Sequence, residues 1–303
     1  MILGRDSFSR DTGPVAGHRD RTRAAPGAGS MVAAVAAALL LSACQVGEIT
    51  YDPAATIDQR AGSTTNIASL SEVVDNNPND ASVYNMRGTA FGRAGKLQEA
   101  LGDFNRALAI DPRYHQVYAN RALVYRRLGE DDAALADYNR ALQVDPDYEA
   151  ALIGRGNIFR LRGDYGRAVA DFNAAIRINS SDPRAYHNRA LIYQAQGNHT
   201  FAIEDFGIAI GLDPNSPEPY VGRGVSYLAA GDLKAALEDF NQALALDSNS
   251  AEAWANRGIA LESAGEVTDA RAAYNRALQI RPGYPPAKDG LGRLDSGRPR
   301  LRT

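Results

Sequence analysis

The sequence predicts an all-α fold built from repeated pairs of antiparallel helices. A proline or serine recurs every 34 residues, and the six units so marked align without a gap. Each unit has glycine at its fifteenth position and alanine at its twentieth and twenty-seventh. Self-similarity at such a period is typical of solenoids, in which each unit packs only on its neighbours. The recurring positions are Pro78, Pro112, Pro146, Ser180, Pro214, Ser248 and Pro282.

The first half of each unit predicts an amphipathic helix. Positions 4, 8 and 11 lie three or four residues apart and so share one helical face. Position 4 is large and position 8 is glycine or alanine. Glycine at position 15 ends this helix, because it adopts the left-handed conformation at little cost. The units begin at Ala81, His115, Glu149, Pro183, Pro217 and Ala251.

The second half predicts another helix, with positions 20, 24, 27 and 28 on one face. Position 24 is aromatic in every unit, whereas positions 20 and 27 are always alanine. The small residues let two helices approach closely, and the aromatic rings fill the space between them. One helix pair cannot bury both faces, so neighbouring units must stack. The aromatic residues are Phe104, Tyr138, Phe172, Phe206, Phe240 and Tyr274.

This pattern resembles the tetratricopeptide-repeat (TPR) signature over residues 81–284. The resemblance implies a right-handed superhelix of antiparallel helix pairs that binds other proteins and is not an enzyme. Residues 66–80 and 285–294 resemble capping helices. The solenoid is therefore expected to span residues 66–294 and to hold about fourteen helices, with a disordered basic tail over 295–303.

The N-terminal segment predicts export. Residues 31–43 form an apolar run too short to span a bilayer, but of the length found in signal peptides. The run ends in Leu41-Ser42-Ala43-Cys44, which resembles the lipobox of bacterial lipoproteins. That resemblance implies a leader over 1–43, lipidation of Cys44, and a flexible tether over 44–65. Residue 45 is not aspartate, which implies the outer membrane, periplasmic face. The alternative is an ordinary secretory signal with a chance cysteine.

Composition excludes several functional classes. The net charge of −3 argues against nucleic acid as the main partner. Cys44 is the single cysteine, so no intramolecular disulfide is possible, and the four histidines show no metal-ligand spacing. No hydrolase, phosphate-loop or metalloprotease motif occurs. We expect no catalytic residue, cofactor, metal or small-molecule substrate.

Two polar rows follow the repeat. Position 7 is arginine in all six units, and position 23 is aspartate in the first five. The favoured interpretation is a structural ladder in which each arginine packs its stem on the core and pairs with an aspartate. The alternative is an arginine row that binds an acidic ligand. The sixth unit has Ala273 at position 23, so Arg257 is expected to lack that partner.

The TPR resemblance also implies a concave binding groove, formed by positions 2, 5, 6, 9, 12 and 13 of the first helices. Asparagine at position 6 resembles the residue that holds a peptide backbone in peptide-binding TPRs. Arginines in units one to three predict binding of an acidic segment, whereas Leu191, Val221, Val225, Leu228 and Ile259 predict an apolar stretch further on. Ordinary solvated side chains are the alternative. The candidate groove residues are Asn85, Arg93, Asn120, Arg126, Arg127, Asn157, Arg160, Asn188 and Asn256.

The expected function is therefore a non-enzymatic scaffold in the bacterial cell envelope. It would be held to the membrane by its lipid and would bind proteins or peptide segments as an adaptor for cell-wall enzymes and proteases. Two alternatives remain open from the sequence: a pilotin-like assembly factor for a pilus or secretion pore, and a soluble TPR subunit of an enzyme complex.

Overall fold

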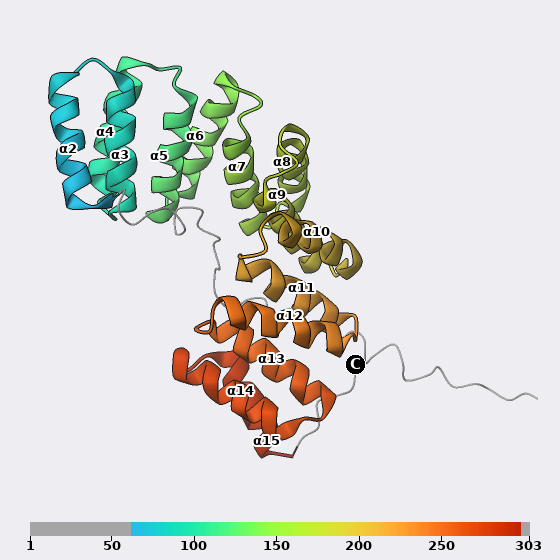
Figure 1. Ribbon diagram of the computed structural model, residues 1–303. Helices are drawn as coiled ribbons and strands as arrows, with labels where there is room; N and C mark the ends of the chain where they lie inside the picture. The colour runs from blue at the N-terminus through green and yellow to red at the C-terminus, as the bar shows by residue number, and fades with distance from the viewer. Residues whose placement is uncertain (1–61, 298–303) are drawn as a thin grey trace, which may run out of the picture.

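The computed structural model describes residues 62–297, which form fourteen α-helices and no strands (Figure 1). The leader, Cys44, most of the tether and most of the predicted tail lie outside these residues. The helices are α2 (Thr64–Asn76), α3 (Ala81–Arg93), α4 (Leu97–Ile110), α5 (His115–Arg127), α6 (Asp131–Val144), α7 (Glu149–Leu161), α8 (Tyr165–Ile178), α9 (Pro183–Ala195), α10 (His199–Leu212), α11 (Pro217–Ala229), α12 (Leu233–Leu246), α13 (Ala251–Ala264), α14 (Val267–Ile280) and α15 (Pro285–Asp295).

A helix starts at each of the six predicted first residues of the repeats. The capping helices extend slightly beyond their predicted limits. Helix α2 begins at Thr64, inside the predicted tether. Asp295, which was assigned to the tail, is the last residue of α15, and its carboxylate accepts a hydrogen bond from Arg271 at 2.6 Å.

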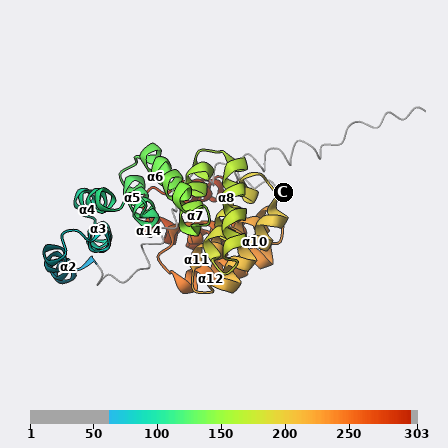
Figure 2. The ribbon, with the colours of Figure 1, turned by 90° about the horizontal axis from the view of Figure 1, so that it is seen from above.

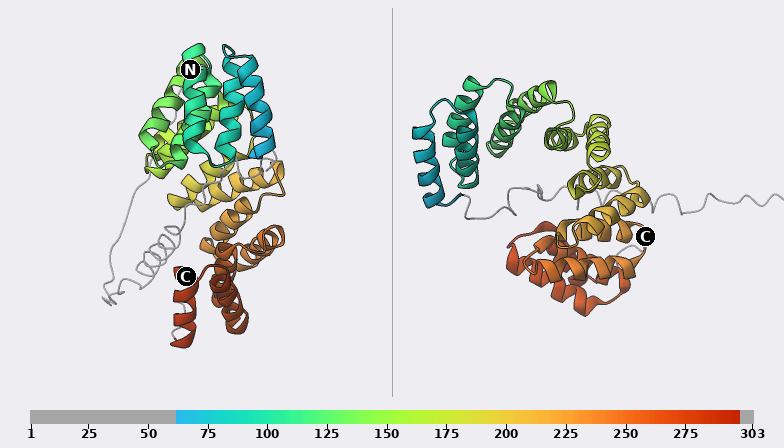
Figure 3. Two further views of the ribbon diagram at one scale, coloured as in Figure 1. Left: turned by 90° about the vertical axis from the view of Figure 1, so that its left-hand side faces the viewer. Right: turned by 45° about the horizontal axis from the view of Figure 1, so that its top comes forward.

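The helices follow one another in a curved array (Figures 1 and 3). Each odd-numbered helix packs on the even-numbered helices before and after it. Odd-numbered helices from α3 to α15 also contact the next odd-numbered helix, as in α5 with α7 and α7 with α9. They therefore lie on the inner side of the curve, which Figure 2 shows from above.

Local signals explain the helix ends. The side chains of Asp80, Asp182 and Ser250 accept backbone hydrogen bonds at the starts of α3, α9 and α13. The glycine at position 15 has a positive φ in all six repeats, for example 76° at Gly129, a conformation that costs other residues more.

The core consists of the residues that the repeat predicts. Alanines at positions 20 and 27 are fully buried, and the six aromatic rings at position 24 are at most 1% exposed. Several rings lie against a glycine. A Cβ atom on Gly154 would come within 2.3–2.5 Å of Tyr138, and one on Gly156 would come within 2.9 Å of Phe172.

Within residues 62–297, no helix has the length and apolar character needed to cross a membrane.

Candidate functional site

The arginine and aspartate rows form five ion pairs, which confirms the ladder interpretation. In each of the first five repeats, Nε and Nη2 of the position 7 arginine donate to the two carboxylate oxygens of the position 23 aspartate. The ten hydrogen bonds measure 2.6–2.9 Å, and the aspartates are 1–7% exposed. Such bidentate pairs are strong and fix orientation. These five arginines are therefore occupied within the fold.

The ladder also joins neighbouring repeats. The Nη1 groups of Arg121, Arg155 and Arg189 donate to Asn105, Asn139 and Asn173 of the preceding repeat, at 2.5–2.8 Å. Arg223 lacks this link because the equivalent position is Gly207. The position 7 arginine thus binds the two helices of its own repeat and, at three junctions, the repeat before.

The concave face of the second and third repeats carries two arginines of another kind. Arg126 on α5 and Arg160 on α7 are partly buried, and neither forms an ion pair with a residue of the described range. Arg160 donates only to the amide oxygen of Asn157, at 2.7 and 3.2 Å, and Asn157 is 6% exposed. Burial, together with the nearby charge of Arg126, lowers the pKa of Arg160 to about 10. The positive charge is therefore held there at an energetic cost.

Neutral polar groups surround these two charges. The Tyr138 hydroxyl is buried and makes no hydrogen bond to a described residue that meets the usual distance and angle limits. Burial raises its pKa to about 12, and the nearby charge of Arg126 partly offsets this rise. His187 on α9 is 6% exposed. Burial and the charge of Arg160 lower its pKa to about 3, so His187 is neutral at pH 7. This cluster of Arg126, Arg160, Asn157, Tyr138 and His187, which we call the cationic cluster, suits an anionic group.

Carboxylates lie at one edge of the cationic cluster. Asp182 caps α9 and forms an ion pair with Arg184. Burial and the neighbouring Asp182 raise the pKa of Glu149, which accepts a hydrogen bond from Asn179 at 3.1 Å. The charge of Arg184 is therefore largely compensated, unlike those of Arg126 and Arg160.

The other predicted groove residues are used in different ways. The Asn120 amide donates to Asn85 at 2.9 Å, so these two asparagines bind each other. Asn188 is 5% exposed and donates to the carbonyl of Arg184. Arg127 donates to the carbonyl of Gly92 at 2.8 Å. Arg93 is exposed and Asn256 is partly exposed, and both lie apart from the cationic cluster in the sequence of repeats.

The predicted apolar stretch of the groove is wrong for three of its five residues. Val221, Leu228 and Ile259 are 5–7% exposed and belong to a single buried cluster of the fifth and sixth repeats. The inner helices α11 and α13 contact each other, so these side chains fill the junction. Leu191 and Val225 remain partly exposed.

Sequence reasoning singled out Arg126, Asn157 and Arg160 but missed Tyr138 and His187. Position 24 is a core position in this repeat, and His187 is the only histidine at position 5. Gly154 was the feature of the sequence that could have indicated the place of Tyr138. Its missing side chain leaves room for the Tyr138 ring to reach the inner side of the array.

No group of histidine, cysteine and acidic side chains within residues 62–297 is arranged to hold a metal ion.

Family models for tetratricopeptide repeats match residues 81–114, 115–148, 156–197 and 187–285, more than half of the chain. The chain belongs to the tetratricopeptide-repeat family. No curated protein gives a significant sequence match.

Solved structures of the same fold are numerous, and three illustrate the range. The Cut9–Hcn1 hetero-tetramer of the APC/C is 18% identical with a TM-score of 0.71, over 85% of this chain and 52% of that one, so this chain spans about half of its length. A tetratricopeptide repeat protein from Parabacteroides merdae is 25% identical with a TM-score of 0.58, over 86% and 99% of the two chains. PilF of Pseudomonas aeruginosa is 18% identical with a TM-score of 0.64, over 70% and 96%. These similarities show the solenoid fold.

Proposed function

We propose that this protein is a non-enzymatic scaffold of the bacterial cell envelope that binds an acidic segment of a partner protein on the concave face of its second to fourth repeats. Its clients would be cell-wall enzymes and proteases, which the solenoid would bring together. The observation that carries the proposal is the pair Arg126 and Arg160, two neighbouring cations that form no ion pair within the described residues.

Arginines of this molecule differ in whether a carboxylate pairs with them. Five arginines at position 7 have a buried aspartate partner. Arg126 and Arg160 are close enough for the charge of one to lower the pKa of the other, and neither has a carboxylate partner among the described residues. A bound carboxylate would relieve this repulsion and form charge-assisted hydrogen bonds, each worth about 1.5–3 kcal/mol. The buried Tyr138 hydroxyl and neutral His187 would add donors without competing negative charge.

The scaffold is tested by recovering partners from cells. Arg126→Glu with Arg160→Glu should lose a set of membrane-fraction proteins that the wild type and a control variant, Arg113→Glu with Arg177→Glu, retain. Both control arginines are exposed, and the net charge changes equally. Identical protein sets from the two variants would contradict the proposal. The identity of the lost proteins would also distinguish an adaptor for cell-wall enzymes from an assembly factor for a pilus or secretion pore.

Envelope attachment is a separate part of the proposal and rests on the sequence around Cys44. Cells that express the wild type and Cys44→Ser would be labelled with a clickable palmitate. Labelling that depends on Cys44 supports a lipid anchor, whereas an unlabelled wild type would mean that the solenoid works without one.

A further inference from the structure

The ladder has one incomplete step, in the sixth repeat. There Ala273 stands at position 23 in place of the aspartate, and it is fully buried. Arg257 consequently makes a single hydrogen bond within the described residues, from Nε to Asn241 at 2.8 Å. In the other repeats Nε serves the aspartate, and any link to the preceding asparagine uses Nη1. The two Nη groups of Arg257 thus have no acceptor among residues 62–297.

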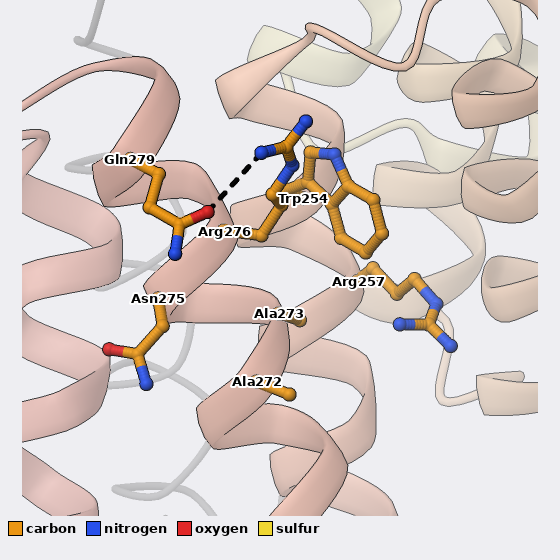
Figure 4. A pocket seen from close by; sticks show the side chains of 7 residues that line it. All are labelled: Trp254, Arg257, Ala272, Ala273, Asn275, Arg276 and Gln279. Atoms are coloured by element: carbon orange, nitrogen blue, oxygen red, sulfur yellow. Dashed lines mark hydrogen bonds between the residues drawn. The ribbon is translucent and has the colours of Figure 1, made fainter.

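A pocket of about 590 Å³ opens at this step, between α13 and α14 (Figure 4). Trp254, Ala272 and Ala273 supply apolar lining, and Arg257, Asn275, Arg276 and Gln279 supply polar groups. Figure 4 shows the Arg257 side chain extending past Trp254 and away from Ala273, with its guanidinium carbon 5.6 Å from the indole centroid.

Two further polar groups of the pocket are available to a ligand. Asn275 stands at the position where Asn105, Asn139 and Asn173 accept from the next arginine, but the next position 7 is Leu291. Its amide makes no hydrogen bond to a described residue. Arg276 is exposed, and its side chain donates only to Gln279, at 3.2 Å. The pocket therefore combines two cations with a free amide and contains no acidic side chain.

We propose that this pocket binds a carboxylate of a partner protein, which takes the place of the missing aspartate and pairs with Arg257. The fold itself indicates the ligand, because the same arginine position binds a carboxylate in bidentate fashion in each of the five other repeats. Arg257 would turn toward Ala273 as its counterparts do toward their aspartates. Arg276 would add a second charge, and the aliphatic stem of the ligand would rest on Trp254. This site lies on α13 and α14, separate from the cationic cluster on α5 and α7, so either proposal can fail alone.

Trp254 is the only tryptophan of the chain, so its fluorescence reports on this pocket directly. The full chain would be titrated with the blocked peptide Ac-Gly-Ala-Glu-Ala-Gly-NH2, and with its glutamine counterpart as the neutral control. We expect a saturable change in emission, at least about tenfold weaker with the glutamine peptide, since a charge-assisted pair is lost. Ac-Gly-Ala-Gly-Ala-OH tests whether a chain-terminal carboxylate serves as well as a side chain.

Two variants test the assignment to Arg257. Ala273→Asp supplies the ladder's own carboxylate, so it should abolish peptide binding while its thermal unfolding midpoint is at least that of the wild type. Arg257→Gln should lose binding by about tenfold or more. Binding that survives in either folded variant, an equal response to the glutamine peptide, or no response at millimolar peptide would overturn the proposal. Tighter binding of inorganic phosphate than of the glutamate peptide would also overturn the carboxylate assignment.

Discussion

At the scale of single residues, the molecule places chemically identical side chains in opposite situations. Arg155 and Arg160 lie on the same helix, α7. Arg155 pairs with Asp171 and also binds Asn139, at 2.7–2.9 Å, whereas the acceptor of Arg160 within residues 62–297 is an amide oxygen. The charge of Arg155 is paired within the fold, whereas the charge of Arg160 is partly buried without a carboxylate among the described residues. Residues that cost stability are often functional, because function and stability compete at binding sites.

Substitution of Arg160 and of Arg155 should change the free energy of unfolding in opposite directions. Arg160→Met removes an uncompensated, partly buried charge and should raise the free energy of unfolding by about 1–2 kcal/mol. Arg155→Met leaves the carboxylate of Asp171 buried without its partner and should lower it by about 2–4 kcal/mol. Urea denaturation of both variants measures the difference. A loss of stability in Arg160→Met as large as in Arg155→Met would show that Arg160 is a structural residue.

Glu252 should make stability depend on pH. Burial and nearby Glu218 raise its pKa to about 7, against an opposing effect of Arg281. Between about pH 4.5 and 7 the folded state keeps a proton on Glu252 that the unfolded state releases. The free energy of unfolding therefore falls as pH rises through this range. Glu252→Gln should remove that slope and be more stable than the wild type at pH 8 by about 2–3 kcal/mol. Parallel pH profiles of the two proteins would contradict the assignment.

At the scale of helices, each buried aromatic ring at position 24 is matched by a missing side chain. Phe104, Phe172 and Phe240 lie against a glycine at position 8 of their own repeat. Tyr138 and Phe206 lie against a glycine at position 6 of the next repeat, Gly154 and Gly222, and there position 8 of their own repeat is alanine. This alternation explains why asparagine recurs at position 6 only in the second, fourth and sixth repeats. The pattern of asparagines therefore follows from packing as well as from any ligand.

A pair of glycine substitutions tests this packing. Gly154→Ala places a Cβ within 2.5 Å of Tyr138 and should destabilise the protein by about 1–3 kcal/mol. Gly102→Ala on α4 meets no atom within 4 Å and should stabilise by up to about 1 kcal/mol, because alanine favours helix. Thermal denaturation of the two variants gives the comparison. Equal changes in stability would mean that the packing of the Tyr138 ring does not require glycine at position 154.

The sequence predicted the first residue of six helices and the glycine that follows each of them, because a 34-residue period averages local signals over six copies. The ladder was predictable for the same reason. Distances between side chains of neighbouring repeats were not predictable in this way. The effect of the Arg126 charge on Arg160 and the burial of Val221, Leu228 and Ile259 depend on how the array curves. Tyr138 and His187 occupy positions whose ordinary role is packing, and periodicity alone could not separate that role from binding.

At the scale of the whole molecule, stability should be distributed along the array as a sum of repeats and junctions. The arginine–asparagine links join repeats one to four, and another joins the fifth and sixth through Arg257 and Asn241. Gly207 interrupts the series between the fourth and fifth repeats. The junction of α10 with α11 therefore lacks this link, although Gln194 of the fourth repeat donates to the Gly222 carbonyl and the Ser226 hydroxyl of the fifth.

Restoring the missing link should strengthen this junction. Gly207→Asn supplies the acceptor for Arg223, whose Nη1 lies 3.7 Å from a Cβ built at Gly207. We expect an increase of about 1 kcal/mol in the free energy of unfolding and a steeper urea transition. Gly211→Asn, on the same helix with no atom within 4 Å, shares the gain in helix propensity but not the link. A transition as steep in the control as in Gly207→Asn would show that the restored link does not strengthen the junction.

The measurement that tests the central claim most directly is the affinity of the purified full chain for a fluorescently labelled, amidated hexaglutamate peptide, followed by anisotropy. If Arg126 and Arg160 form the recognition site, Arg126→Glu with Arg160→Glu should weaken binding by about tenfold or more. The control variant Arg113→Glu with Arg177→Glu should change it by no more than about twofold, since exposed charges act mainly through screened, long-range attraction. Equal weakening in the two variants would reduce the interaction to general electrostatics, and the concave cationic cluster would then not be a binding site.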